Sequence, residues 1–117
     1  MNTVCLTGYL NFEPEVKISA SGKEFLSNVI GVREDYKGVD GKYKYNNIRF
    51  SAFGNTAGFI GDYVKKGDKI EIVGKINAEQ VDGNYRQNVI VSSVSILQSK
   101  SQNDFSRDFK EEIPDIF

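Results

Sequence analysis

Aromatic and cationic side chains are interleaved along one stretch of the chain. The side chains that share one alternation phase there are Tyr43, Tyr45, Arg49 and Phe53. An aromatic ring can stack on any nucleobase and a cation attracts phosphate, so this mixture suits sequence-independent binding of a single nucleic-acid strand. The alternative is that the rings pack strands together or cover a subunit interface, which is common for Tyr and Phe.

A strand is needed to hold these side chains on one side. Between residues 43 and 53, the apolar side chains of Ile48, Phe50 and Ala52 take the opposite phase. Strict alternation is the period of a half-buried strand. The apolar phase therefore predicts the core side, and the interleaved phase predicts the solvent side.

Further elements surround this strand. Alternation predicts strands over residues 3–10, 24–33, 70–76 and 85–97, with a short extended segment around Val16 and Ile18. A helix is predicted to begin at Asn55 or Thr56 as N-cap and to be stopped by Gly67, because apolar side chains between them have helical spacing. The polar segment 34–42, with its Asp40-Gly41 turn signal, is predicted to be a long working loop.

The predicted order of elements is β-β-β-α-β-β. Five strands with a helix between the third and fourth is the arrangement of the oligonucleotide-binding barrel. Small barrels of the SH3 type share the strand count but lack a helix of this length at that place. We therefore expect an all-β, five-stranded oligonucleotide-binding barrel over residues 1–100.

The formal net charge of −1 is unusual for a nucleic-acid protein, but the charge is unevenly distributed. Residues 1–100 contain 13 Lys and Arg against 11 Asp and Glu, whereas residues 101–117 contain 2 against 5. The last segment has no apolar period and cannot bury enough surface to fold alone. We expect a slightly basic barrel followed by a disordered acidic tail.

Several classes of function lack support in the sequence. Without histidine and with a single cysteine, the chain offers no zinc site, no internal disulfide and no recognisable catalytic base, so we expect neither a metal, a cofactor nor an enzyme. Cys5 is interpreted as a small core residue. No segment approaches the ~20 apolar residues of a membrane helix, and the N-terminus lacks signal-peptide features, so a cytoplasmic location is expected.

Several motifs in the right order resemble the bacterial and phage single-stranded DNA-binding protein family. They are the opening Met-Asn-Thr-Val-Cys-Leu-Thr-Gly-Tyr-Leu, Glu13-Pro14-Glu15, the segment Arg49-Phe50-Ser51-Ala52-Phe53-Gly54, and Tyr63-Val64-Lys65-Lys66-Gly67-Asp68. The resemblance covers nearly the whole chain. It implies base stacking at Tyr36 and Phe53 and phosphate contact at Arg49.

The chain departs from the family where tryptophan is frequent, since the corresponding positions are Asn47 and Val81. Weaker stacking, or a DNA path shifted towards other tyrosines, would follow. The full set of candidate DNA-binding residues is Arg33, Tyr36, Lys37, Tyr43, Tyr45, Asn47, Arg49, Phe53, Lys75, Tyr85 and Arg86.

The C-terminus is similar to the acidic family tip that ends in Ile-Pro-Phe, although two residues separate Pro from the final Phe here. Its residues are Glu111, Glu112, Ile113, Pro114, Asp115, Ile116 and Phe117. A terminal Phe preceded by acids suits a partner pocket with an apolar floor and a basic rim. The alternative is a tail that only improves solubility.

These observations predict a non-catalytic protein that coats single-stranded DNA during replication, recombination and repair and recruits partners through its tail. An adaptor barrel for replication restart, with secondary DNA contact, is the alternative. An RNA-binding barrel of the cold-shock kind is disfavoured because its paired aromatic motifs are missing. The resemblance implies a homotetramer, with a homodimer as the alternative, in a bacterial cell or a phage-infected host.

Overall fold

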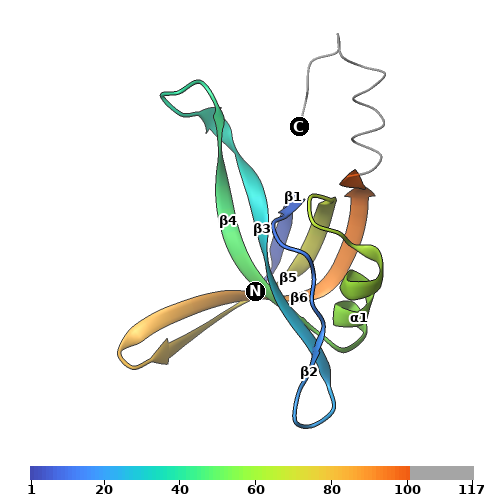
Figure 1. The fold of residues 1–117 in the computed structure, drawn as a ribbon. Coiled ribbons are helices and arrows are strands. Elements are labelled where there is room, and N and C mark those ends of the chain that lie inside the picture. Colours follow the sequence, from blue (N-terminus) through green and yellow to red (C-terminus); the bar gives the residue numbers. More distant parts are fainter. Residues whose placement is uncertain (101–117) are drawn as a thin grey trace.

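The computed structural model describes residues 1–100, which fold into strands and a single helix (Figure 1). In chain order the elements are β1 (Val4–Leu10), β2 (Lys17–Ile18), β3 (Glu24–Lys37), β4 (Tyr43–Phe53), α1 (Gly54–Tyr63), β5 (Lys69–Val81) and β6 (Asn84–Gln98). The predicted tail, residues 101–117, lies outside the described residues.

The five long strands close into a ring. β1 pairs antiparallel with β5 and, through Tyr9 and Leu10, with β3, while β3 pairs with β4 and β5 with β6. A short parallel contact between β4 and β6, with Phe50 beside Val89, completes the circuit. A sheet closed on itself is a barrel. The predicted oligonucleotide-binding barrel with one helix before the fourth long strand is confirmed, with the two-residue β2 added.

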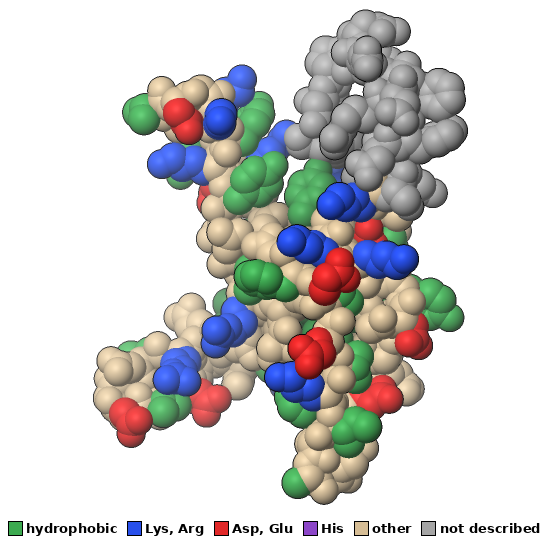
Figure 2. Space-filling view, in the orientation of Figure 1, with side chains coloured by type: hydrophobic (Ala, Val, Ile, Leu, Met, Phe, Trp, Pro, Cys, Tyr) green, Lys and Arg blue, Asp and Glu red, His purple; other side chains and the backbone are tan. Residues whose placement is uncertain are grey.

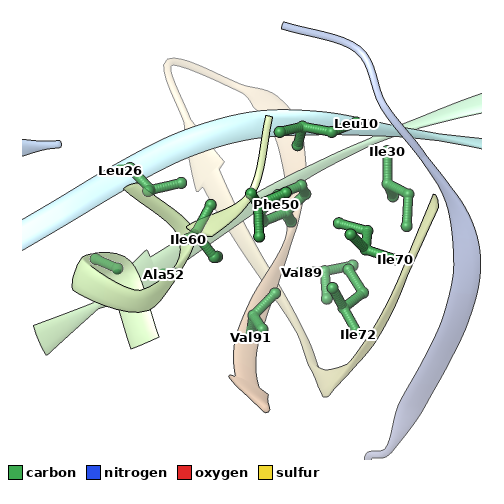
Figure 3. Close-up of a cluster of buried hydrophobic side chains, with 12 residues drawn as sticks. Leu10, Leu26, Ile30, Phe50, Ala52, Ile60, Ile70, Ile72, Val89 and Val91 are labelled. Atoms are coloured by element: carbon green, nitrogen blue, oxygen red, sulfur yellow. The ribbon is translucent and has the colours of Figure 1, made fainter. Parts of the chain in front are cut away.

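The apolar phase of each strand fills the interior, together with one face of α1 (Figure 3). In β4 the predicted core residues Phe50 and Ala52 are fully buried and Ile48 is partly buried. Among residues 1–100 the buried apolar residues are Leu10, Leu26, Ile30, Phe50, Ala52, Ala57, Ile60, Val64, Ile70, Ile72, Val89 and Val91. Because successive side chains of a strand point to opposite faces, this interior fixes which residues of β4 face outward.

Asn28, a polar residue in the apolar phase of β3, is 5% exposed. Its side-chain Nδ2 donates to the carbonyl oxygen of Phe12 at 3.0 Å, and its Oδ1 accepts from the Phe12 backbone N–H at 3.3 Å. A buried side-chain amide whose donor and acceptor both have hydrogen-bond partners costs little free energy. Asn28 therefore ties the segment after β1 to the barrel wall.

Glycine is required where two strands approach closely. A Cβ added at Gly74 would collide with the backbone carbonyl of Ile90, and one at Gly8 with the carbonyl of Gly31. These positions lie next to the β5–β6 and β1–β3 contacts. The absence of a side chain there lets the ring close.

The predicted loop 34–42 is shorter in the structure. β3 continues to Lys37, four residues beyond the predicted end, and an irregularity in pairing lies between Arg33 and Lys37. Polar residues conceal this extension because both faces of a projecting hairpin meet water, so no apolar alternation marks it. Only residues 38–42 remain as the turn.

The helix also begins differently from the prediction. Its N-cap is Phe53, with φ −134° and ψ 154° and no side-chain cap hydrogen bond, rather than Asn55 or Thr56. The last residue of β4 enters the helix directly, and this tight junction leaves no capping side chain. The helix ends at Tyr63, and Gly67, with φ +89°, forms the following turn.

Cys5 was expected in the core, and that expectation is wrong because its side chain is exposed. Cys5 shares the outward phase of β1 with Thr7, while Leu6 and Gly8 take the inward phase. Ser51 differs in the other direction, since it lies on the outward phase of β4 but is only 8% exposed.

Candidate nucleic-acid interface

The β3–β4 and β5–β6 hairpins project far from the barrel (Figure 1). We call residues 32–46 the β3–β4 arm and residues 75–88 the β5–β6 arm. The β5–β6 arm runs from Lys75 in β5 to Asn88 in β6 through the turn at Asp82 and Gly83, whose φ angles of 52° and 81° are those of a tight hairpin turn. Most side chains of both arms are exposed. The candidate residues lie on these arms and on the adjoining part of β4.

The outward row of β4 carries the aromatic rings that the sequence singled out. Tyr43, Tyr45 and Phe53 are 41%, 47% and 42% exposed, and Arg49 between them is also exposed. Their common phase opposite Phe50 sets this arrangement. Partly buried rings with an exposed flank provide a platform on which a base can stack.

Cations lie against two of these rings. The guanidinium carbon of Arg33 is 4.4 Å from the centroid of the Tyr43 ring, and the Lys37 Nζ is 5.2 Å from it. The Lys23 Nζ is 5.5 Å from the Phe53 centroid. At these distances a cation is attracted to the ring face and steadies it. The sequence reasoning missed Lys23, because it lies before β3 and meets Phe53 only in the folded sheet.

The β5–β6 arm continues the same outer surface. The Asn88 Nδ2 donates to the Ser51 Oγ at 2.7 Å across the β4–β6 contact, which places the two side chains on one face. The register pairs Asn77 with Asn88 and Glu79 with Arg86, so alternation puts Arg86 on that face too. Lys75, paired with Ile90, shares it.

Two predicted residues point away from this surface. Lys37 is opposite Tyr43 in the register and shares its face, so the adjacent Tyr36 projects from the other side of the arm. Tyr85 alternates with Arg86 in the same way. Their rings are 60% and 76% exposed. The structure therefore does not bring Tyr36 and Tyr85 together with the β4 row.

Asn47 lies between the arm and the barrel. Its Oδ1 accepts a hydrogen bond of 3.0 Å from the Asn11 Nδ2, above Gly31, where an added Cβ would lie 2.9 Å from the Asn11 Oδ1. Beside it, the rings of Tyr9 and Tyr45 meet edge to face at 6.4 Å between centroids. The sequence reasoning missed Tyr9 and Asn11. The outward phase of Tyr9 in β1 was the available signal.

Lys and Arg side chains are spread over the face shown in Figure 2, along the β3–β4 arm and between the two arms, with hydrophobic side chains among them.

Within residues 1–100, no cluster of three His, Cys, Asp or Glu side chains is placed to hold a metal ion. Val81, a position where the resembled family often has tryptophan, is partly buried at the end of β5. The outward row of β4 and the adjoining arms offer aromatic rings for stacking and cations for phosphate contact.

No helix in the described part of the chain is long and apolar enough to cross a membrane.

Comparison with known proteins gives a consistent picture. A single-stranded DNA-binding protein of Fusobacterium nucleatum is 33% identical over 109 residues, covering 88% of this chain and 71% of its own length. Single-stranded DNA-binding protein 2 of a Nostoc species is 31% identical, covering 85% of this chain and 80% of its own. Single-stranded DNA-binding protein 1 of Staphylococcus aureus is 26% identical over 113 residues, covering 92% of this chain and 72% of its own length.

Among solved structures, the single-stranded DNA-binding protein from Thermus aquaticus superposes with a TM-score of 0.70 at 19% identity. The match covers 87% of this chain, which spans 53% of that protein's chain. This likeness supports the barrel fold. The model of the single-strand binding protein family matches residues 1–102, including every candidate residue on the barrel and its arms. The chain therefore belongs to the single-strand binding protein family.

Proposed function

We propose that this chain coats single-stranded DNA without sequence preference during replication, recombination and repair. The observation that carries the proposal is the outward row of β4, where three exposed rings share one face with Arg49 and two of them, Tyr43 and Phe53, have cations beside them. Base stacking is tolerant of sequence because every base has a π-face. Family membership supports single-stranded DNA as the ligand.

In this proposal the rings of Phe53, Tyr45 and Tyr43 stack with bases. Arg49 contacts phosphate between them, and Lys75 and Arg86 extend the phosphate track along the β5–β6 arm. The cations over Tyr43 leave part of its ring available, since the side chain is 41% exposed. A DNA strand bound to this surface would run along β4 and continue onto the β5–β6 arm.

Tyr36 and Tyr85 favour a longer path or a second role. Because both project from the far faces of their arms, DNA would have to wrap around an arm to stack on them. In the adaptor alternative, the rings of Tyr36 and Tyr85 contact a partner protein, and contact with DNA is secondary. Tyr36→Ala and Tyr85→Ala separate the two readings, since only the first requires weaker DNA binding.

We also propose that the chain forms a homo-oligomer, with a homotetramer favoured over a homodimer. Among residues 1–100, β1 pairs with β3 only through Tyr9 and Leu10, while its other side pairs with β5 from Val4 to Tyr9. The edge from Val4 to Thr7 is therefore available to the same strand of another copy. A monomer by light scattering across micromolar concentrations would contradict this proposal.

The acidic residues 111–117 are proposed to recruit replication or repair proteins. They lie outside the described residues, so the proposal rests on their sequence: an apolar end with acids before it suits a basic-rimmed pocket. The barrel of residues 1–100 would hold DNA while the tail binds partners. We place this activity in the cytoplasm of a bacterium or a phage-infected host.

The deciding experiment is a titration followed by tyrosine fluorescence, using single-stranded DNA, duplex DNA and RNA of matched length at two salt concentrations. We expect tight binding to single-stranded DNA that weakens as salt rises and keeps a salt-resistant part from stacking. Equal affinity for duplex DNA would overturn the proposed function. Preference for RNA would assign the barrel to the cold-shock alternative instead.

A further inference from the structure

The outer face of α1 presents two aromatic rings that belong to no core. Phe59 and Tyr63 are 37% and 64% exposed, and their ring centroids are 5.2 Å apart. The opposite face of the helix packs inward through Ala57 and Ile60. The pair takes no part in the DNA-binding surface proposed above.

A basic rim adjoins this aromatic pair. The exposed residues Lys65 and Lys66 follow the helix, and the chain then turns at Gly67. The carboxylate of Asp68, only 3% exposed, accepts from the backbone N–H of Lys65 at 2.8 Å and from that of Lys100 at 2.7 Å. This carboxylate clamps the end of the described chain to the turn that follows α1.

The side chain of Lys100 lies over that turn, since a Cβ at Gly67 would come within 2.8 Å of its Cδ. The chain therefore leaves the barrel beside the end of α1, among three lysines. The first residues after this exit point include four acids and two aromatic residues. The acids are Asp104, Asp108, Glu111 and Glu112, and the aromatic residues are Phe105 and Phe109.

We propose that residues 104–112 dock on the outer face of α1 in the same chain. Phe105 and Phe109 would cover the rings of Phe59 and Tyr63, and the acids would face the lysine rim. Both aromatic pairs are four residues apart in sequence. The negative charge of residues 104–112 complements the positive charge of the lysine rim. Docking would also remove apolar surface of both aromatic pairs from water.

The length of the connection permits this docking. Phe105 is the fifth residue after Lys100, which gives a reach of about 17 Å when the chain is extended. Tyr63 lies four residues before Gly67, which Lys100 contacts, so it is within about 14 Å along the chain. A short tether supplies an effective concentration of ~1 mM or more, so even a weak contact is populated.

Docking would restrain the proximal tail against the helix while the tip beyond it stays available. It would release when salt screens the lysine rim, or when a partner competes for Phe105 and Phe109. The inference does not depend on DNA binding, and it concerns a surface separate from the β4 row.

The test uses the full chain with Phe105→Trp as a reporter, because the protein contains no other tryptophan. Without DNA, we expect blue-shifted emission and weak acrylamide quenching of the introduced indole. Adding Phe59→Ala and Tyr63→Ala should shift the emission to the red and raise the quenching constant several-fold. Lys65→Glu with Lys66→Glu should act in the same direction. Tyr85→Ala, which removes an exposed ring from the β5–β6 arm, is the matched control and should leave the indole unchanged.

An indole fully exposed in the parent, or equally protected in the Phe59 and Tyr63 double variant, would overturn the proposal. Co-refolding the reporter chain with excess chains carrying Phe59→Ala and Tyr63→Ala tests the same-chain assignment. Protection should persist in the mixture. Its loss on mixing, or on dilution of the parent, would mean that a second copy occupies this face instead.

Discussion

The barrel and its two arms use the same kind of strand for opposite purposes. Within the barrel, one phase of each strand is buried, whereas in the arms both phases meet solvent. β4 belongs to both regions, since Phe50 fills the core and Phe53, on the other phase, presents its ring outward. The comparison shows that alternation lets a rigid wall position a binding row without giving up its packing. The arms then extend that row at little cost to the core.

The largest expected effect is a loss of stability when a core side chain of the barrel is removed. Phe50→Ala should lower the free energy of unfolding by about 3–5 kcal/mol, because a fully buried ring leaves a cavity among side chains from several strands. Urea denaturation of the variant and the parent measures this. If the variant keeps its stability but loses DNA affinity, the inward and outward phases of β4 have been assigned in reverse.

A smaller effect, on binding rather than stability, is expected from the outward phase. Phe53→Ala should weaken binding to single-stranded DNA by roughly 1–3 kcal/mol if a base stacks there, while the urea midpoint stays close to that of the parent. Phe59→Ala, which removes the same side chain from α1, is the matched control and should leave affinity unchanged at moderate salt. Unfolding of the Phe53 variant would move Phe53 into the core.

Arg49 distinguishes charge from stacking on the same row. Arg49→Ala should reduce the slope of log affinity against log salt by about 1, because one phosphate contact is lost. Fluorescence titrations at four or more salt concentrations give the slope. Lys66→Ala, a cation beyond α1, should not change it. An unchanged slope for Arg49→Ala would place the phosphate track elsewhere.

The smallest effect on DNA affinity is expected from the tail. Deleting residues 105–117 should leave DNA binding intact or make it slightly tighter at low salt, since an acidic segment no longer competes for the basic surface. The same deletion should abolish capture of replication or repair proteins from a host lysate, and removal of Phe117 alone should do most of that damage. Identical capture by the Phe117 deletion would make the tail a solubility device.

Much of the fold was predictable because apolar and polar residues alternate along every strand that has one buried face. The range of β4, residues 43–53, was predicted correctly, as was the inward phase of its apolar side chains. The extension of β3 to Lys37 was missed because its polar residues carry no such signal in a projecting hairpin. Cys5 was misjudged from the general tendency of cysteine to be buried, although its phase with Thr7 pointed outward.

The candidate site was only partly predictable, because its members come from separate strands. The sequence grouped Tyr43, Tyr45, Arg49 and Phe53 through their common phase. It could not show that Lys23 lies over Phe53 or that Tyr9 meets Tyr45, since these contacts need the β-sheet register. It also could not separate Tyr36 from Lys37, because the irregularity between Arg33 and Lys37 decides which side chain shares the face of Tyr43.

The sequence by itself determined the order of elements, the inward phase of β4 and the chemistry of its outward row, because local periodicity follows from the burial of one strand face. Tertiary structure alone decided that the β5–β6 arm joins that row, since the short parallel pairing of Phe50 and Ser51 with β6 closes the ring and aligns two hairpins far apart in sequence. It also decided that Lys100, the last described residue, lies against the turn that follows α1, because the buried carboxylate of Asp68 holds its backbone there. Such long-range contacts depend on closure of the barrel, which no local pattern encodes.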